Sequence, residues 1–148
     1  MHRVLYAAIY LFAGISIFGC AESNRDTSSK MTADAMSPTE LAAYAASHHY
    51  PSMPATDDLR VAAIVSPDRS ELKLYNFSNA PLADVDVWVN GSWMQHVRGI
   101  GASGSVIIKT SNLYNAFGKN FAGQSEPVSR VQLRTGDKFY NAMGPVTQ

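Results

Sequence analysis

The chain has 148 residues, in which 12 lysines and arginines balance 12 aspartates and glutamates. Charged residues make up only 16%, so the chain lacks the basic field of a nucleic-acid-binding protein, and no nucleic-acid partner is expected. The hydrophobic class reaches 46%, which argues against global disorder, and the single cysteine excludes an internal disulfide framework. The length allows one ordinary domain with appendages.

The first twenty residues are predicted to be an export signal. A short basic start precedes an uncharged apolar stretch, residues 4–18, which is shorter than the roughly 20 residues that cross a bilayer as a helix. The alternative is a retained membrane helix or a buried core helix. The only cysteine follows the apolar stretch directly, in the quartet Ile17-Phe18-Gly19-Cys20. This quartet resembles the lipobox of bacterial lipoproteins.

The resemblance to bacterial lipoproteins implies that signal peptidase II removes residues 1–19 and that Cys20 becomes the lipidated N-terminus. Several acyl chains anchor a protein durably, because each buried methylene contributes about 0.8 kcal/mol. Ala21 follows the cysteine, which in Gram-negative lipoproteins is typical of sorting to the outer membrane. The expected partner is the lipid bilayer, and the expected location is the bacterial cell envelope, facing the periplasm or the exterior.

A flexible tether and one short helix are predicted next. Residues 20–36 are small and polar without periodicity, which is typical of a tether. Residues 37–59 are expected to form a helix and a proline-containing linker. Ser37 can cap the helix and Glu40 can complete a capping box, while the prolines that follow His49 end the helix near that residue.

From residue 60 onward the hydrophobic period changes to two, which predicts an all-β domain over 60–148. The expected strands are 60–66, 71–77, 83–89, 92–98, 105–110, 129–134 and 138–143. Seven short strands without helical crossovers indicate an antiparallel sandwich or barrel. The pattern over 72–143 resembles a small immunoglobulin- or fibronectin-type module, most specifically over 83–97, which implies an immunoglobulin-like β-sandwich.

Asn90-Gly91 between two alternating runs predicts a hairpin with a type I′ turn, whose central residues both need a positive φ. A two-residue loop pairs Trp88 with Trp93, and opposed residues share a face of the sheet. One face, with the character of a core, then holds Val85, Val87, Val89, Met94 and His96. The other face, which is mixed in character, holds Asp86, Trp88, Trp93, Gln95 and Val97.

The predicted tryptophan face has three interpretations. If it is exposed, Trp88, Trp93, Gln95 and Asp86 are candidate contacts for an envelope protein, a sugar ring or a peptidoglycan strand. Alternatively, the helix at 37–48 covers it, or the two indoles only stabilise the hairpin across its strands.

Three sequence patterns resemble binding or catalytic sites but are not expected to function as such. The glycines at 99, 101 and 104 match a dinucleotide-binding motif, but a strand pattern follows them where a helix is required, so a turn is expected. Adjacent His48 and His49 point about 100° apart on a helix, so no metal site is expected. His96 has no positioned nucleophile or orienting carboxylate, so no catalytic residue is expected.

The sequence therefore predicts a membrane-anchored extracytoplasmic lipoprotein that carries a non-enzymatic structural or interaction module, with no cofactor. The alternatives are a carbohydrate- or peptidoglycan-binding module that uses the tryptophan face, and a small hydrolase.

Overall fold

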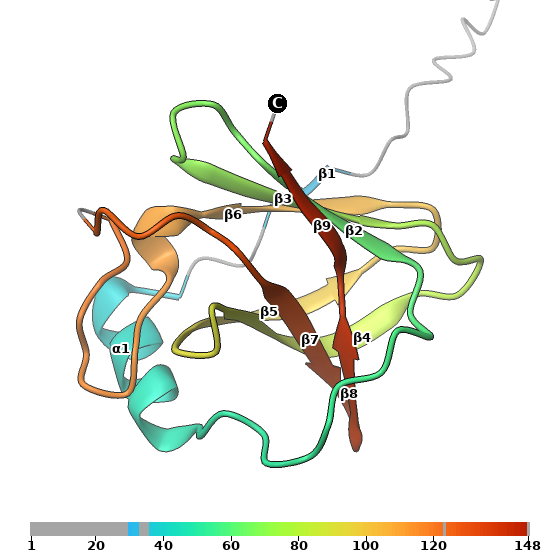
Figure 1. Ribbon diagram of the computed structural model, residues 1–148. Helices are drawn as coiled ribbons and strands as arrows, with labels where there is room; N and C mark the ends of the chain where they lie inside the picture. Colours follow the sequence, from blue (N-terminus) through green and yellow to red (C-terminus); the bar gives the residue numbers. More distant parts are fainter. Residues whose placement is uncertain (1–29, 33–35, 123, 148) are drawn as a thin grey trace, which may run out of the picture.

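The computed structural model describes residues 30–32, 36–122 and 124–147. They form a two-layer β-sandwich with one short helix, α1 (Pro38–Ser47), beside one layer (Figure 1). The predicted signal, the lipobox with Cys20 and most of the predicted tether lie outside the described residues. No helix in the described ranges is long and apolar enough to cross a membrane.

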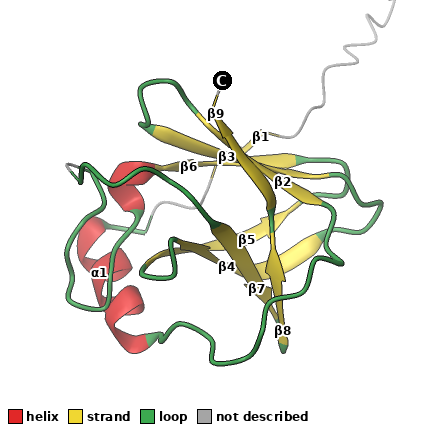
Figure 2. Ribbon diagram, in the orientation of Figure 1, coloured by secondary structure: helices red, strands yellow, loops and turns green. Residues whose placement is uncertain are grey.

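The strands divide between a five-stranded and a four-stranded sheet (Figure 2). Their bounds are β1 Lys30–Thr32, β2 Val61–Val65, β3 Glu71–Asn76, β4 Leu82–Val89, β5 Trp93–Ile100, β6 Ser105–Lys109, β7 Val131–Thr135, β8 Lys138–Asn141 and β9 Met143–Thr147. The five-stranded sheet has the order β1-β6-β3-β2-β9, and the four-stranded sheet has the order β5-β4-β7-β8. The seven predicted strands are confirmed as β2 to β8, so the all-β prediction holds.

Two strands were not predicted. β1 pairs in parallel with β6 and falls within the segment predicted to be a tether. β9 pairs in parallel with β2 at the far edge of the same sheet. Its Gly144-Pro145 sequence argues against a strand, but an edge strand tolerates proline because one side of its backbone has no ladder to complete.

The core lies between the two sheets. Val61, Ala63 and Val65 of β2 alternate with less buried residues, as a half-buried strand requires. Every second residue of β4 likewise points inward, and Val85 and Val87 are fully buried. Burial of one such aliphatic side chain contributes about 1.5–3 kcal/mol, so this interior is the main source of the domain's stability.

Helix α1 has the predicted start and end. The Glu40 N–H donates to the Ser37 hydroxyl at 3.3 Å, and the Ser37 N–H donates to the Glu40 carboxylate at 2.7 Å. This reciprocal pair is the predicted capping box. The helix ends at Ser47, and it buries Leu41 and Ala45.

The predicted register of the Asn90-Gly91 hairpin is wrong by one residue. Both turn residues have a positive φ, 52° and 72°, and the Ser92 N–H donates to the Val89 carbonyl at 3.1 Å. Ser92 then stays outside the ladder, which begins one residue later, at the pair Val89 and Trp93. A slip of one residue moves every side chain of β5 to the opposite face.

The shared tryptophan face is therefore also wrong. Trp88 pairs with Met94 on the outer face of the four-stranded sheet, whereas Trp93 points into the core. The slip also pairs Asp86 with His96, two residues predicted to lie on opposite faces. The prediction that His96 has no orienting carboxylate is therefore wrong, because Asp86 Oδ1 lies 3.0 Å from its Nδ1.

In the segment between β6 and β7, apolar Leu113, Phe117 and Phe121 are spaced by four, which predicts a helical turn or a loop packed against the core. The segment begins with a 3-10 turn, η1 (Thr110–Asn112), and continues as a loop in which Leu113 and Phe121 are buried. Phe117, spaced four residues from each, is 87% exposed. Gly99 lies in β5, and Gly101 and Gly104 flank a turn that leads into β6, so the predicted turn is present in place of a helix.

Candidate functional site

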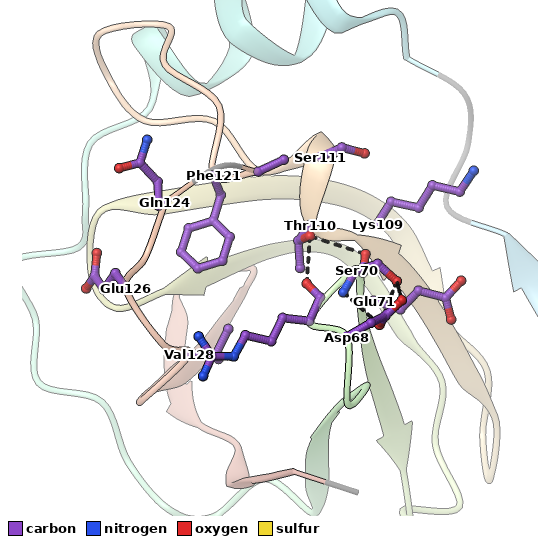
Figure 3. Close-up of a pocket in the computed structure, with 12 residues that line it drawn as sticks. Asp68, Ser70, Glu71, Lys109, Thr110, Ser111, Phe121, Gln124, Glu126 and Val128 are labelled. Atoms are coloured by element: carbon purple, nitrogen blue, oxygen red, sulfur yellow. Dashed lines mark hydrogen bonds between the residues drawn. The ribbon is translucent and has the colours of Figure 1, made fainter.

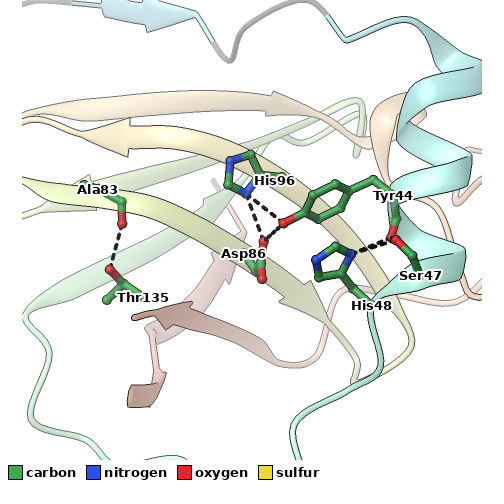
Figure 4. Close-up of polar contacts among 7 residues, drawn as sticks. All are labelled: Tyr44, Ser47, His48, Ala83, Asp86, His96 and Thr135. Atoms are coloured by element: carbon green, nitrogen blue, oxygen red, sulfur yellow. Dashed lines mark hydrogen bonds and ion pairs between the residues drawn. The ribbon is translucent and has the colours of Figure 1, made fainter. Parts of the chain in front are cut away.

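A cluster of three polar side chains fastens α1 to the outer face of the four-stranded sheet (Figure 4). The Tyr44 hydroxyl donates to Asp86 Oδ1 at 2.9 Å, and His96 Nδ1 lies 3.0 Å from the same oxygen. Tyr44 comes from α1, Asp86 from β4 and His96 from β5. A ten-residue helix is marginal alone, so this cluster and the apolar contacts beside it hold α1 in place.

The surroundings of Tyr44 suit attachment better than catalysis. Burial, followed by the hydrogen bond to Asp86, raises the pKa of the Tyr44 hydroxyl above its usual range. The His48 ring stacks on Tyr44 with 3.8 Å between the ring centroids. A phenol that resists deprotonation is a poor base or nucleophile but a stable hydrogen-bond donor. The cluster therefore positions the helix and the chain that follows it.

The four predicted contact residues do not share one surface. Trp88 is 4% exposed and packs with Ala45, Met94 and Phe139 beneath α1, close to Asp86, which is 8% exposed. Trp93 is 7% exposed and meets Phe121 edge to face, with ring centroids 5.4 Å apart, in the core. Gln95 is also buried and pairs across the ladder with core residue Val87. In the described part of the chain, Trp88 Nε1 and Gln95 Oε1 have no hydrogen-bond partner.

A hollow of about 470 Å³ lies beside the turn between β2 and β3 (Figure 3). Three of its polar side chains, those of Asp68, Ser70 and Thr110, are engaged with the turn itself. Asp68 accepts hydrogen bonds from Ser66 and Ser70, which lower the pKa of its carboxyl to about 2. Thr110 donates to the Arg69 and Ser70 carbonyls. These groups stabilise the turn and have little capacity left for a ligand.

A second hollow, of about 400 Å³, opens at the end of the β4–β5 hairpin, and we call it the hairpin hollow. Three segments surround it: the chain after α1, the hairpin loop and the loop before β7. Four aromatic side chains line it, Tyr50, Trp88, Trp93 and Phe117. Although the two indoles lie on opposite faces of the hairpin, both reach this hollow.

The chain after α1 contributes a firmly held wall. The Tyr50 hydroxyl donates to Gln132 Oε1 at 2.6 Å. The Tyr50 ring meets Trp88 and Phe139 edge to face, with centroids 5.5 and 5.4 Å apart. This geometry is favourable for aromatic pairs, so the ring is fixed from both its hydroxyl and its edges.

The hairpin loop is held by the side chain of Asn90. Its Nδ2 donates to Glu126 Oε1 and to the Pro127 carbonyl, each at 2.8 Å. Its Oδ1 accepts from the N–H groups of Ser129 and Arg130 at 2.9 and 3.1 Å. These bonds join the three-residue hairpin loop to the segment before β7.

The loop that carries Phe117 is also closed by local hydrogen bonds. Asn115 Oδ1 accepts from the N–H groups of Phe117 and Lys119 at 3.0 and 2.9 Å, and the Gly118 N–H donates to the Asn115 carbonyl at 3.0 Å. Gly118 has a φ of 71°, which suits glycine. The exposure of Phe117 was not predicted, because its spacing of four with Leu113 and Phe121 suggested a core role. Asn115 and Gly118 are residue types that favour turns, and they were the signal in the sequence that this segment is a surface loop.

Among the residues that the structure describes, no three histidine, cysteine, aspartate or glutamate side chains are arranged to hold a metal ion. Comparison with known proteins adds no relative: no family model, curated protein or solved structure matches this chain.

Proposed function

We propose that this protein is a lipid-anchored extracytoplasmic lipoprotein whose β-sandwich is a non-enzymatic interaction module. The hairpin hollow is its contact surface. The observation that carries the proposal is Phe117, an aromatic side chain that is 87% exposed at the hollow although its loop is closed by hydrogen bonds. Tyr50, which is 37% exposed, lines the same hollow, and exposed aromatic side chains that gather at a concave surface are typical of a binding site.

The lipobox-type quartet at residues 17–20 supports the anchor. In the proposal, acylated Cys20 lies in the bilayer of the cell envelope, at the outer membrane, and the sandwich faces the periplasm or the exterior. Charge cannot supply the attachment, because the basic and acidic residues are equal in number.

The division of strands supports an immunoglobulin-like type of sandwich. Counting β2 to β8 as the seven strands of such a module, the first, second and fifth lie in one sheet. The third, fourth, sixth and seventh lie in the other. This division is that of fibronectin-type modules, which serve widely as interaction domains.

The bonding of the polar groups supports a non-enzymatic role. The Asp86 carboxylate is engaged by both Tyr44 and His96, and these three residues line neither hollow. A general base needs a free position within reach of a substrate, and this cluster is used to attach α1 instead.

Metabolic labelling tests the anchor. The full chain, expressed in a Gram-negative host, is expected to incorporate labelled palmitate and to fractionate with membranes, whereas Cys20→Ser does neither. The proposed anchor is wrong if the wild type takes up no label and the Cys20→Ser variant fractionates as the wild type does.

Photo-crosslinking in the intact envelope tests the contact surface. A photoreactive analogue replaces Phe117 in the full chain, and the matched control carries it at Phe77, another exposed phenylalanine that does not line the hollow. We expect a discrete crosslinked product from position 117 and none from position 77. Equal products from both positions, or no product from position 117, would contradict the proposed surface.

A further inference from the structure

We infer that the hairpin hollow binds a neutral saccharide of one or two rings. This inference rests on the proposed function of the domain as an interaction module, and it names the chemical class of the ligand. It is drawn from the side chains that meet at the hollow, from their unused hydrogen-bonding groups and from the size and charge of the space.

The aromatic side chains of the hollow suit the apolar faces of a sugar. A sugar ring presents C–H groups on its faces and hydroxyl groups around its edge. Phe117 and Tyr50 supply most of the exposed aromatic surface, and the largely buried Trp88 and Trp93 reach the same space with small exposed areas. Such rings provide rigid apolar area at a small entropy cost, and Phe117 supplies the most exposed part of it.

Polar groups with spare capacity lie among these rings. Ser92, Asn115 and Glu126 line the same hollow. In the described structure, the Ser92 hydroxyl, Asn115 Nδ2 and Glu126 Oε2 make no hydrogen bond. They offer a hydroxyl group, an amide donor and a carboxylate acceptor, the three kinds of partner that the hydroxyl groups of a sugar require.

The size and charge of the hollow argue against other ligands. A space of about 400 Å³ is within the range of pockets that hold small molecules, and it suits one or two sugar rings. One carboxylate, Glu126, and two imidazoles, His48 and His49, line the hollow, and the Arg130 guanidinium lies at its border beside Gly91. Neither sign of charge dominates, as a positive charge does in a site for phosphate. Mixed aromatic and polar walls without a dominant charge fit a neutral, hydroxyl-rich ligand.

The walls are held in position before any ligand arrives. Gln132 holds Tyr50, the Asn90 side chain holds the hairpin loop, and Asn115 holds the loop of Phe117. A ligand therefore loses little affinity to the ordering of the protein, which is the condition under which small ligands bind well.

Titration with short oligosaccharides tests the inference. The full chain is purified in a detergent without a sugar head group and titrated by calorimetry with the disaccharides chitobiose, cellobiose and maltose. Both tryptophans of the chain line the hollow, so their fluorescence is an independent readout. We expect at least one of the three to bind saturably at millimolar concentration or below and to change the emission. Failure of all three to bind would overturn the inference.

A pair of variants ties binding to the hollow. Phe117→Ala is expected to weaken binding about tenfold, because an aromatic anchor at a contact surface dominates its affinity. Phe77→Ala, a change at a phenylalanine that is 52% exposed, is expected to bind like the wild type. The same melting temperature in both variants shows that the fold is intact. Equal affinity of Phe117→Ala and the wild type would overturn the inference.

The crosslinking experiment separates this inference from the proposed function. A crosslink from position 117 to an envelope protein, with no saccharide binding, overturns the saccharide and leaves the interaction module standing. If neither a crosslink from position 117 nor saccharide binding is observed, the interaction module and the saccharide are both overturned.

Discussion

Asp86 and His96 face each other across the β4–β5 ladder, with 3.0 Å between Asp86 Oδ1 and His96 Nδ1. The hydroxyl of Tyr44 donates to the same oxygen, so one carboxylate joins two strands and a helix. The chain that leaves this helix forms a wall of the hairpin hollow. The position of that wall therefore depends on a cluster outside the hollow.

Tyr44→Phe removes the hydrogen bond between α1 and the sheet while keeping the ring. We expect the free energy of unfolding to fall by about 1–2 kcal/mol, since a hydrogen bond to a charged group contributes more than a neutral one. Urea denaturation measures the change. Tyr75→Phe is the control, because the Tyr75 hydroxyl makes no hydrogen bond to any residue that the structure describes. An equal loss in the two variants would contradict the role given to Tyr44.

The pKa of Tyr44 also predicts a loss of stability in alkali. Burial and the bond to Asp86 raise this pKa in the folded state, so the folded protein holds the phenol proton more tightly than the unfolded chain does. The contribution of Tyr44 to the free energy of unfolding is fully present below about pH 10, the pKa of an exposed tyrosine. It is lost as the pH rises above that value. The loss, followed by urea denaturation between neutral pH and pH 11, is expected to be smaller in Tyr44→Phe than in the wild type.

Asp68 predicts a loss of stability in acid. Hydrogen bonds from Ser66 and Ser70 lower the pKa of Asp68 to about 2 from the ordinary value of 3.8. A lowered pKa means that its contribution is present above pH 3.8 and is lost as the pH falls toward 2. Asp68→Asn is expected to be less stable than the wild type at neutral pH and to lose less stability over that acid range. Parallel acid profiles for the two proteins would show that the turn does not depend on the carboxylate.

Gly99→Ala is expected to be strongly destabilising because β4 and β5 approach closely at this position. A Cβ atom there would lie 2.5 Å from the Leu82 carbonyl oxygen, a backbone atom that moves only with its strand. We expect a loss of about 1–3 kcal/mol or more in the free energy of unfolding. In Gly101→Ala the new Cβ meets no atom within 4 Å, so thermal unfolding is expected to change little. A larger loss in Gly101→Ala would contradict the close approach.

The separation of the two indoles predicts additive effects of their substitution. Trp88 and Trp93 belong to different buried clusters, so Trp88→Phe and Trp93→Phe are expected to destabilise independently. Their losses should sum in the double variant to within about 0.5 kcal/mol, as measured by urea denaturation. A larger deviation from additivity would indicate that the two indoles contact each other directly. A hairpin with a two-residue loop, in which Trp88 pairs with Trp93, would produce that contact.

Much of the fold could be predicted because it depends on near neighbours in the chain. The seven strands from β2 to β8 follow from alternating polarity, and the capping box of α1 needs only residues 37–40. The positive φ angles at Asn90-Gly91 follow from the two residue types. β9 was missed because its glycine and proline indicate a turn, and only its place at the sheet edge permits a strand.

The candidate site was less predictable. Trp88 and Trp93 were predicted as contacts on one shared face, and both line the hairpin hollow, but from opposite faces of the hairpin. Phe117 was assigned to the core, whereas the structure leaves it exposed. Its exposure depends on whether the rest of the chain reaches its loop, and no spacing rule contains that information.

The sequence alone determined where strands, turns and the helix start occur, because these depend on the preferences of a residue and its immediate neighbours. Only the tertiary structure decided the register of β4 and β5. Asn90 bonds to residues 36 to 40 positions away, and those bonds accompany a three-residue loop. Since side chains alternate along a strand, that single added residue brought His96 to Asp86 and carried Trp93 into the core.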